Sequence, residues 1–419
     1  MFWFCKMDER NLQTSIVMEE IVKRLAYWLY GFLFHLFRIC PVRKKKVVLF
    51  MIHNSKFRGS LKFIHDEMKK RDSEFEFVVV SKKQLFSVSG KGMKKIVSLC
   101  KGAFYFYVIL NYHMATAGYI FLNDNFQPLA YMNVSKKTKV VQVWHGVGAF
   151  KRFGLSTEKD PVVRNCTRKG NQKVTHLFVS SEQVIPYYAE AMGMEESRIY
   201  ADGIPVTDYY FDEEMKCAGR EHVYQEYPEL KGKKILLYTP TFRESEEENK
   251  ALLCQFDYKA IKKRLGEEWA VLVRLHPQIH KQVSIKESEC YDVTEYRDIK
   301  ELYTVADVLV NDYSSTVVEY ALFDKPIILY AYDLEKYDRG FYRDYKENAP
   351  GIISYTQEEL MQVLDVICGN TKDKAQIEEM NQVMRANREH FLSLQYDYMD
   401  GMATKRVVDR VLEKRKNNE

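Results

Sequence analysis

The sequence lacks the signature motifs of several nucleotide-binding and metal-dependent enzymes. It contains no Walker G-x-x-x-x-G-K-[ST], and SGKGMKK at 89–95 lacks the third glycine of a dinucleotide-binding fingerprint. It also contains no D-x-D pair, the carboxylates that commonly hold a divalent metal during sugar-nucleotide transfer. We therefore predict a protein with no metal and no cofactor, in which Arg, Lys, His and helix N-termini handle any bound phosphates.

The low numbers of cysteines and prolines and the small net charge also exclude several classes of protein. The 8 cysteines are scattered singly with no C-x-x-C pair, and we interpret them as reduced thiols of a cytosolic protein. The net charge of +5 on 419 residues is a small excess, which argues against a nucleic-acid partner. With 46% hydrophobic and 29% charged residues and 10 prolines, the composition is that of a globular protein of two or three domains.

The apolar run near the N-terminus is shorter than the roughly 20 residues of a bilayer span. This run, LAYWLYGFLFHLF at 25–37, contains Trp and Tyr and is flanked by cations, among them Lys23 and the RKKK run at 43–46. Such a pattern is typical of an amphipathic helix that lies at the headgroup level of an anionic leaflet. We expect 1–45 to be a membrane-associating segment; a helix buried against the next domain is the alternative. A late start and no obvious cleavage site disfavour a signal peptide.

The remaining chain alternates short apolar runs with amphipathic stretches, the rhythm of β-α-β units around parallel sheets. This pattern predicts an α/β protein of two doubly wound domains that face each other across a cleft. The strands expected in the first domain are 46–52, 75–80, 117–123, 139–144 and 176–181. Those expected in the second are 234–239, 270–275, 306–311 and 326–332.

Ligands of open α/β sheets bind beyond the carboxyl ends of the strands. The segments at these ends are WHG at 144–146, PTFR at 240–243, HPQ at 276–278 and DYSST at 312–316. Arg243, at the end of PTFR, is predicted to bind a nucleotide through its charge.

DYSST is the best candidate for an anion site. Ser314 and Ser315 precede a helix expected to begin near Thr316, and Glu319 three residues on indicates a capping box. Backbone N–H groups at such a helix start favour phosphate. The alternative is that the hydroxyls only cap the helix.

Two histidines follow apolar strands directly. His145 and His276 are each candidates for a general base or a phosphate ligand, although each could be a structural histidine at a strand end. Glycines follow His145, and they allow a ligand to approach the backbone closely. Lys151 and Arg152 come next; they either hold a phosphate of a polymer or are solvated surface cations.

Several motifs in this order resemble one family. They are QVWHGVGAFKRFG, YTPTFRE, VRLHPQ, the stretch 292–333 and RGFYRDY, which lie between about Lys46 and Ser354. Together they resemble the CDP-glycerol glycerophosphotransferase family, the membrane-associated teichoic acid primases and polymerases of Gram-positive bacteria. The resemblance implies a GT-B-like fold of two Rossmann-type domains behind a membrane-docking region. The domains would be an acceptor-side domain at 46–207 and a CDP-donor-binding domain with C-terminal helices at 208–419.

The resemblance also implies residue roles. His145 matches the proposed general base, and a donor-facing loop runs from Trp144 through Gly146 to Gly148. The positions that match nucleotide-diphosphate ligands are Pro240, Thr241, Arg274, His276, Ser314 and Ser315, with Glu319 at the family's acidic position.

Two departures from the family pattern bear on donor or acceptor preference. W-H-G-T-P reads W-H-G-V-G here, with Val147 and Gly148 in place of a threonine and a proline. In the loop GIPVTD, Val206 stands where an arginine often binds.

The resemblance implies transfer of a polyol phosphate, most simply glycerol 3-phosphate, from CDP-glycerol or CDP-ribitol to a hydroxyl of a lipid-linked acceptor. CMP would be released at the cytoplasmic face of the membrane. Two alternatives are a GT-B glycosyltransferase that uses a nucleotide sugar and a non-catalytic membrane scaffold that binds polymer. The sequence leaves open the polyol, the number of units added, the acceptor, whether the polymer is a teichoic acid or a capsule, and the oligomeric state.

Overall fold

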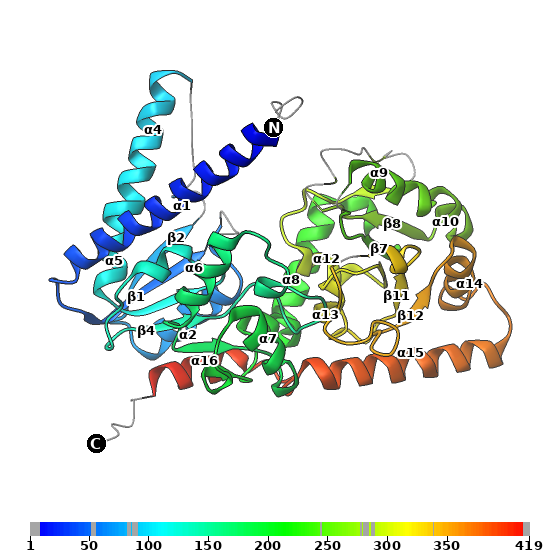
Figure 1. The fold of residues 1–419 in the computed structure, drawn as a ribbon. Coiled ribbons are helices and arrows are strands. Elements are labelled where there is room, and N and C mark those ends of the chain that lie inside the picture. Colours follow the sequence, from blue (N-terminus) through cyan, green and yellow to red (C-terminus); the bar gives the residue numbers. More distant parts are fainter. Residues whose placement is uncertain are drawn as a thin grey trace. The chain divides into compact units, whose positions relative to one another are not determined.

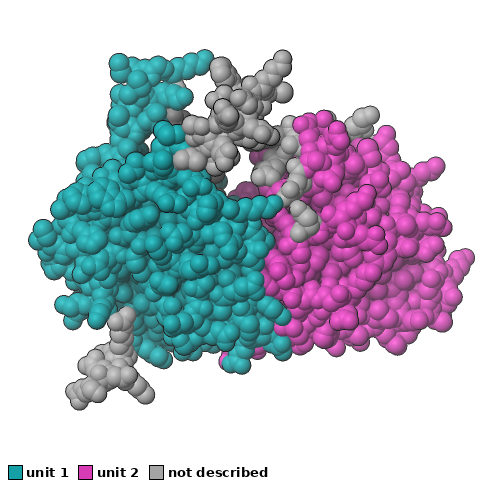
Figure 2. Space-filling view, viewed as in Figure 1, with its two compact units in different colours: residues 1–145, 153–206, 402–419 teal, residues 146–152, 207–401 magenta. Residues whose placement is uncertain are grey.

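The chain folds into two compact units, coloured separately in Figure 2. The structure, a computed structural model, describes residues 9–51, 56–81, 85, 91–243, 245–276, 279, 285, 290–337 and 339–413. Unit 1 comprises residues 1–145, 153–206 and 402–419, and unit 2 comprises residues 146–152 and 207–401. The segment after residue 401, which we expected in the second domain, is thus part of unit 1.

Unit 1 is built on a parallel sheet of six strands. Its strands are β1 (Arg43–Met51), β2 (Glu76–Ser81), β3 (Ala117–Leu122), β4 (Lys139–Gln142), β5 (His176–Phe178) and β6 (Ile199–Tyr200), in the order β2-β1-β3-β4-β5-β6. The interior strand β1 is buried continuously from Val47 to Met51, as expected where helices cover both faces of a parallel sheet. Helices packed around this sheet include α2 (Ser60–Arg71), α6 (Pro161–Asn171), α7 (Ile185–Met192) and α16 (Ala403–Leu412).

Two helical segments of unit 1 extend beyond this sheet (Figure 1). Helix α1 (Glu9–Phe37) buries Tyr30 and Phe34, and Tyr30 packs against Phe126 with ring centroids 5.4 Å apart. Helix α4 (Met93–Phe104) continues through the π-helical turn η1 (Tyr105–Leu110) into α5 (Asn111–Thr116). Among the described residues, no helix has both the length and the apolar character needed to cross a membrane. One face of α1, with Tyr30 and Phe34, packs on the unit, while Trp28 and Phe32 on the same helix are exposed.

Unit 2 contains a second parallel sheet of six strands. These are β7 (Lys234–Thr239), β8 (Trp269–Val273), β9 (Tyr291–Asp292), β10 (Val308–Asn311), β11 (Ile327–Tyr330) and β12 (Ile352–Ser354), in the order β12-β11-β10-β7-β8-β9. Numbered along the chain from β7 and read from the β9 edge, this order is 3-2-1-4-5-6, the arrangement of Rossmann dinucleotide-binding folds. The topological switch point, where ligands bind in such folds, therefore lies between β7 and β10.

Helices of several lengths surround the second sheet. They are α8 (Glu213–Glu226), α9 (Glu246–Gln255), α10 (Tyr258–Leu265), α12 (Ile299–Val305), α13 (Thr316–Tyr320), α14 (Gln357–Ile367) and α15 (Lys374–Gln395). In the core of this unit, Tyr238 of β7 stacks on Phe256 with ring centroids 3.7 Å apart.

The expectation of an α/β fold with two parallel sheets is confirmed. Each of the strands predicted from the sequence overlaps an observed strand. Strands β6, β9 and β12 were missed because runs of two or three residues are too short to show a period.

Candidate functional site

The loops after β7 and β10 are tied together at the switch point of unit 2. The Thr241 backbone N–H donates to both carboxylate oxygens of Asp312, at 2.9 and 3.0 Å. The Asn311 side-chain amide donates to the hydroxyl oxygens of Thr239 (2.7 Å) and Thr316 (2.6 Å). The strand-end rule therefore correctly brought PTFR and DYSST together, and Pro240 lies between Thr239 and Thr241 on the same loop.

The predicted capping box of α13 is absent. Such a box requires Thr316 to precede the helix, but Thr316 is already its first residue and its hydroxyl accepts from Asn311. Ser315 is the N-cap residue with φ −65° and ψ −3°, a helical conformation, and its side chain makes no capping bond. The prediction was wrong because the helix begins one residue earlier than the box needs. The Ser314 hydroxyl oxygen accepts a hydrogen bond of 3.4 Å from the Thr316 backbone N–H at the helix start, whereas Ser315 is exposed and makes no capping bond. The alternative in which the hydroxyls cap the helix therefore describes Ser314 and not Ser315.

Glu319 forms its hydrogen bond with a tyrosine and not with the backbone at the start of the helix. Its carboxylate accepts a hydrogen bond of 2.6 Å from the hydroxyl of Tyr210, a residue of the 3-10 segment η6 (Pro205–Phe211). Burial raises the pKa of Glu319 above its ordinary value, although the bond from Tyr210 acts in the opposite direction. In this structure Glu319 joins η6 to α13, and its contact with a nucleotide stays a prediction.

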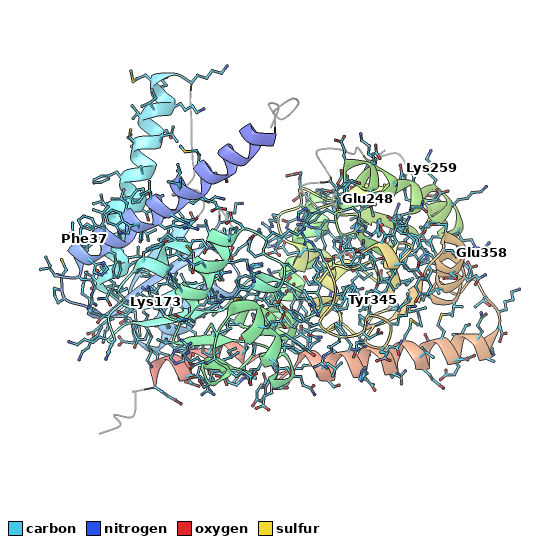
Figure 3. All side chains as sticks on the ribbon, viewed as in Figure 1. Phe37, Lys173, Glu248, Lys259, Tyr345 and Glu358 are labelled. Atoms are coloured by element: carbon cyan, nitrogen blue, oxygen red, sulfur yellow. The ribbon has the colours of Figure 1, made fainter. Side chains whose placement is uncertain are left out.

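Arg243 is buried between two carboxylates. Its Nε and Nη2 donate to the two oxygens of Asp333 at 2.7 and 2.9 Å, and its Nη1 donates to Asp312 at 3.0 Å. Its guanidinium also lies over the Tyr313 ring, 4.9 Å from the centroid. Tyr345, labelled in Figure 3, donates from its hydroxyl to the Asp312 carbonyl at 2.8 Å. Through these bonds Arg243 stabilises the loops at the switch point. Its contact with a nucleotide stays a prediction.

Two cationic side chains and a histidine gather beside these loops within unit 2. Lys151 pairs with Phe341 through an isolated antiparallel bridge, two residues from Arg339. The Arg339 guanidinium lies over the ring of Phe242, 4.6 Å from the centroid. The His276 ring also lies 4.6 Å from Phe242. We call Lys151, His276 and Arg339 the cation cluster. Arg339 was not among the predicted site residues, although RGFYRDY, which begins with it, was recognised.

The positive charges of Lys151 and Arg339 repel each other and lower the pKa of neighbouring groups. Burial, with contributions from Arg339 and Arg243, lowers the pKa of Lys151 to about 8, while Asp312 acts in the opposite direction. Burial, Lys151 and Arg339 lower the pKa of His276 below its ordinary value. Like charges held this close favour an anionic ligand, because an anion would relieve their mutual repulsion.

A cavity of about 190 Å³ adjoins the cluster. Its lining combines the aromatic rings of Phe242 and Tyr337 with Arg339, Lys336 and Glu248. Glu248, labelled in Figure 3, forms a capping box with Ser245 at the start of α9. Aromatic faces beside cations suit a ligand that carries both a planar base and phosphates.

Arg274 supports the loop that follows β9. Its Nη1 donates to the carbonyl oxygens of Val293 (3.3 Å) and Tyr296 (2.9 Å). The position of Arg274 directly before Leu275 and His276 makes it a support for the strand end that presents the histidine. Pro277 and Gln278 of the HPQ motif lie outside the described residues.

In unit 1, a strained residue precedes His145. Trp144 has φ +49°, and no other non-glycine residue in the described ranges has a positive φ. Its backbone N–H donates to Gln142 Oε1 at 2.9 Å. Its ring packs against those of His145 and Phe153, with centroids 4.2 and 5.6 Å away. His145 is exposed, with Nδ1 3.3 Å from the Asn123 carbonyl. Strain of this kind persists where the surrounding structure enforces it, commonly at functional sites.

The segment that begins at Gly146 belongs to unit 2 and requires a glycine at 148. Gly148 has φ +65°, and a Cβ there would lie 2.3 Å from Gln395 Oε1 and 2.8 Å from a Val318 methyl group. The same Gln395 oxygen accepts from the Ala149 N–H at 2.9 Å. The positive φ excludes a proline, whose φ is fixed near −65°, and the close contacts exclude any Cβ at this position.

Comparisons with known proteins agree on one family. The model of the family CDP-Glycerol:Poly(glycerophosphate) glycerophosphotransferase matches residues 32–413. A teichoic acid poly(ribitol-phosphate) polymerase of Bacillus spizizenii is 31% identical over 96% of this chain, which spans only 62% of that relative. A teichoic acid ribitol-phosphate primase of the same species is 28% identical, over 94% of this chain and 97% of the relative.

A solved structure has the same fold. It is the wall teichoic acid polymerase TagF, in a variant soaked with CDPG, with a TM-score of 0.73 and 21% identity. The match covers 97% of this chain and 98% of that chain.

Proposed function

Because the chain belongs to the CDP-Glycerol:Poly(glycerophosphate) glycerophosphotransferase family, we propose that it transfers a polyol phosphate from a CDP-activated donor to a hydroxyl of a lipid-linked acceptor. CMP is the other product, and the polymer is a teichoic acid or a related cell-surface polymer. The observation that carries this proposal is the cation cluster at the switch point of unit 2. The repelling charges of Lys151 and Arg339, with the imidazole of His276 beside them, suit the pyrophosphate of a nucleotide diphosphate.

In the proposed reaction, the acceptor oxygen forms a bond to the distal phosphorus of the donor. The bond between that phosphorus and the bridging oxygen breaks, and the electron pair leaves on CMP. Lys151, His276 and Arg339 stabilise the charge that develops on the phosphates, and Ser314 and Ser315 supply hydroxyl donors. Arg243 holds the loops in place through Asp312 and Asp333.

His145 is the proposed general base. Its Nδ1 faces the Asn123 carbonyl, which favours the tautomer with the proton on Nδ1. Nε2 is then the basic nitrogen that takes the acceptor proton.

The substitution His145→Ala tests this role. We expect turnover to fall by roughly two to four orders of magnitude, while CDP-polyol affinity, measured by calorimetry, stays within about twofold. His390→Ala, which removes an exposed histidine of α15, is the matched control and should keep full activity. Unchanged turnover in His145→Ala would remove the assignment.

A donor panel tests the function itself. The family is named for glycerophosphate and both relatives for ribitol phosphate, so CDP-glycerol and CDP-ribitol are assayed with a lipid-linked acceptor. Mass spectrometry should show acceptor extended by a polyol phosphate together with CMP. Turnover of UDP-sugars alone would favour the glycosyltransferase alternative, and no binding of any CDP-polyol would favour the scaffold.

We also propose that unit 1 docks on the cytoplasmic face of the membrane. Helix α4 buries none of its residues among the described parts of the chain, and Met93 (73%), Ile96 (55%) and Phe104 (58%) are exposed. On α1, Trp28 and Phe32 are exposed beside the buried Tyr30 and Phe34. Helix α4 also carries lysines at 94, 95 and 101, which suit an anionic headgroup layer.

A further inference from the structure

Unit 1 contains a second basic pocket, formed by residues to which neither the donor nor the base is assigned. Its volume is about 530 Å³, and α6, α7 and the turn η3 (Gly154–Ser156) contribute to its lining. Three arginines, Arg164, Arg168 and Arg198, line it together with two glutamates, Glu190 and Glu195. The pocket therefore has a net positive lining and also carries acceptors for hydroxyl groups.

Two of the arginines are held in place without losing their charge. Arg164 Nη1 donates to the carbonyl oxygens of Leu155 (2.6 Å) and Glu158 (2.8 Å). Arg198 Nη1 donates to the carbonyls of Gln172 (2.8 Å) and Val174 (2.9 Å). Backbone carbonyls orient a guanidinium but do not neutralise it, so both side chains remain cations able to bind an anion.

Arg198 Nε and the Arg168 guanidinium make fewer interactions than the groups described above. Arg198 Nε is buried without a hydrogen bond, and the nearest carboxylate oxygen, from Glu195, is 3.9 Å away. Arg168 is exposed and forms no ion pair or side-chain hydrogen bond with the described residues. Arg164, Arg168 and Gln172 are spaced four residues apart, so they share one face of α6, about 6 Å apart along its axis. This row of donors suits a chain with repeated anionic groups better than a single ion.

The acidic side of the pocket suits hydroxyl groups. Glu190 accepts a hydrogen bond of 2.7 Å from the Ser156 hydroxyl, and both residues line the pocket. A carboxylate and a hydroxyl opposite guanidinium groups provide partners for a ligand in which phosphates alternate with polyols.

Side chains packed behind the pocket lining connect it to the segment that holds His145. Phe153 stacks on Trp144 and packs edge-on against Tyr188 of α7, with ring centroids 4.9 Å apart. Directly after Phe153 comes Gly154, where a Cβ would lie 2.3 Å from the Ala191 carbonyl oxygen. The chain then enters the pocket lining at Leu155. This packing connects the pocket to the proposed base through contacts within unit 1.

We propose that this pocket binds polyol-phosphate units of the acceptor chain, with the arginines on the phosphodiesters and Glu190 on a polyol hydroxyl. The inference rests on the proposed function and extends it, because it gives the enzyme a second site that binds the already polymerised part of the acceptor. An acceptor with several repeats then binds more tightly than one with a single repeat.

Arg168→Gln tests the proposal, with Lys169→Gln as the matched control. Both substitutions remove one positive charge from an exposed residue of α6, but Lys169 does not line the pocket. The probes are soluble hexamers of glycerol phosphate and ribitol phosphate, with inorganic phosphate and phosphatidylglycerol vesicles for comparison. We expect Arg168→Gln to weaken binding of a hexamer by roughly three- to tenfold and Lys169→Gln by less than about twofold.

Kinetics provides a second readout. In the wild type, kcat/KM should be higher for a multi-repeat acceptor than for a single-repeat acceptor. Arg168→Gln should remove that advantage and leave the KM for the CDP-polyol unchanged. Equal losses in both variants, or a wild type that binds inorganic phosphate or vesicles as well as it binds the hexamers, would overturn the pocket assignment.

These outcomes separate the two proposals. An enzyme that releases CMP from a CDP-polyol but shows no chain-length preference retains the proposed function and loses the pocket. A protein that binds hexamers through Arg168 but turns over no CDP-polyol contradicts the proposed function.

Discussion

Among single residues, Lys151 has a charge that depends directly on its surroundings. Burial and neighbouring cations disfavour its protonated form and lower its pKa to about 8. A bound pyrophosphate would favour the protonated form, so binding above that pH requires uptake of a proton. His276, whose pKa is below its ordinary value, stays neutral over the same range.

We therefore expect CDP-polyol affinity to be flat from about pH 7 to 8 and then to fall by up to roughly tenfold per pH unit. Isothermal titration from about pH 7 to 9.5 measures this dependence. In Lys151→Gln the affinity should be lower at neutral pH, and the decrease above pH 8 should disappear. An unchanged pH profile in that variant would show that another group titrates.

A substitution at Arg243 tests whether this residue stabilises the fold by holding Asp312 and Asp333 or contacts the nucleotide directly. Its removal leaves the buried Asp312 and the half-buried Asp333 without their cation. Breaking a buried ion pair costs about 3–5 kcal/mol. Arg243→Met should therefore lower the free energy of unfolding by about that amount in urea titrations.

The matched control is Arg264→Met, because Arg264 also bonds both oxygens of an aspartate, Asp365, but is 54% exposed. An exposed pair contributes about 0–1 kcal/mol, so this variant should be nearly neutral. Similar losses in the two variants would contradict the bracing role of Arg243.

At the scale of elements, the sequence predicts those parts of the site that follow long buried strands. KILLYT and ADVLVN are strongly apolar because β7 and β10 are central strands, so the loops after them were located correctly. The capping box failed because the pattern does not specify which residue is the first in helical conformation. Arg339 was missed because no strand precedes it and its partner Phe242 is distant in sequence.

Helix α4 provides a prediction at the same scale. Ile96 and Phe104 are eight residues apart, so they lie on the same face. Replacing both with aspartate should weaken binding to phosphatidylglycerol vesicles by at least roughly tenfold, because apolar area is lost and negative charge is added. Co-sedimentation measures the bound fraction, and CMP release with a soluble acceptor should be retained. Met399→Asp, at an exposed apolar residue of unit 2, is the control. Full vesicle binding by the α4 variant would contradict docking through this helix.

At the scale of the whole molecule, the return of the chain to unit 1 could not be predicted from the sequence. The segment 402–413 follows the last helix of unit 2, and sequence proximity favours the neighbouring domain. Its amphipathic pattern predicts a buried face but does not identify the partner of that face. In the structure, Val407, Val408 and Val411 are fully buried in unit 1, and Arg410 pairs with Asp202.

Truncation after Gly401 should therefore destabilise unit 1 selectively. Each buried valine contributes at most about 1.5–3 kcal/mol, so loss of α16 should cost several kcal/mol. Hydrogen exchange should accelerate in β1 and β3, whereas amides of β7 and β10 should keep their protection. Lys405→Ala, which alters only an exposed residue of α16, is the control for the helix itself. Faster exchange in β7 and β10 with no change in β1 and β3 would mean that α16 stabilises unit 2, because protection is lost first where buried apolar contacts are removed.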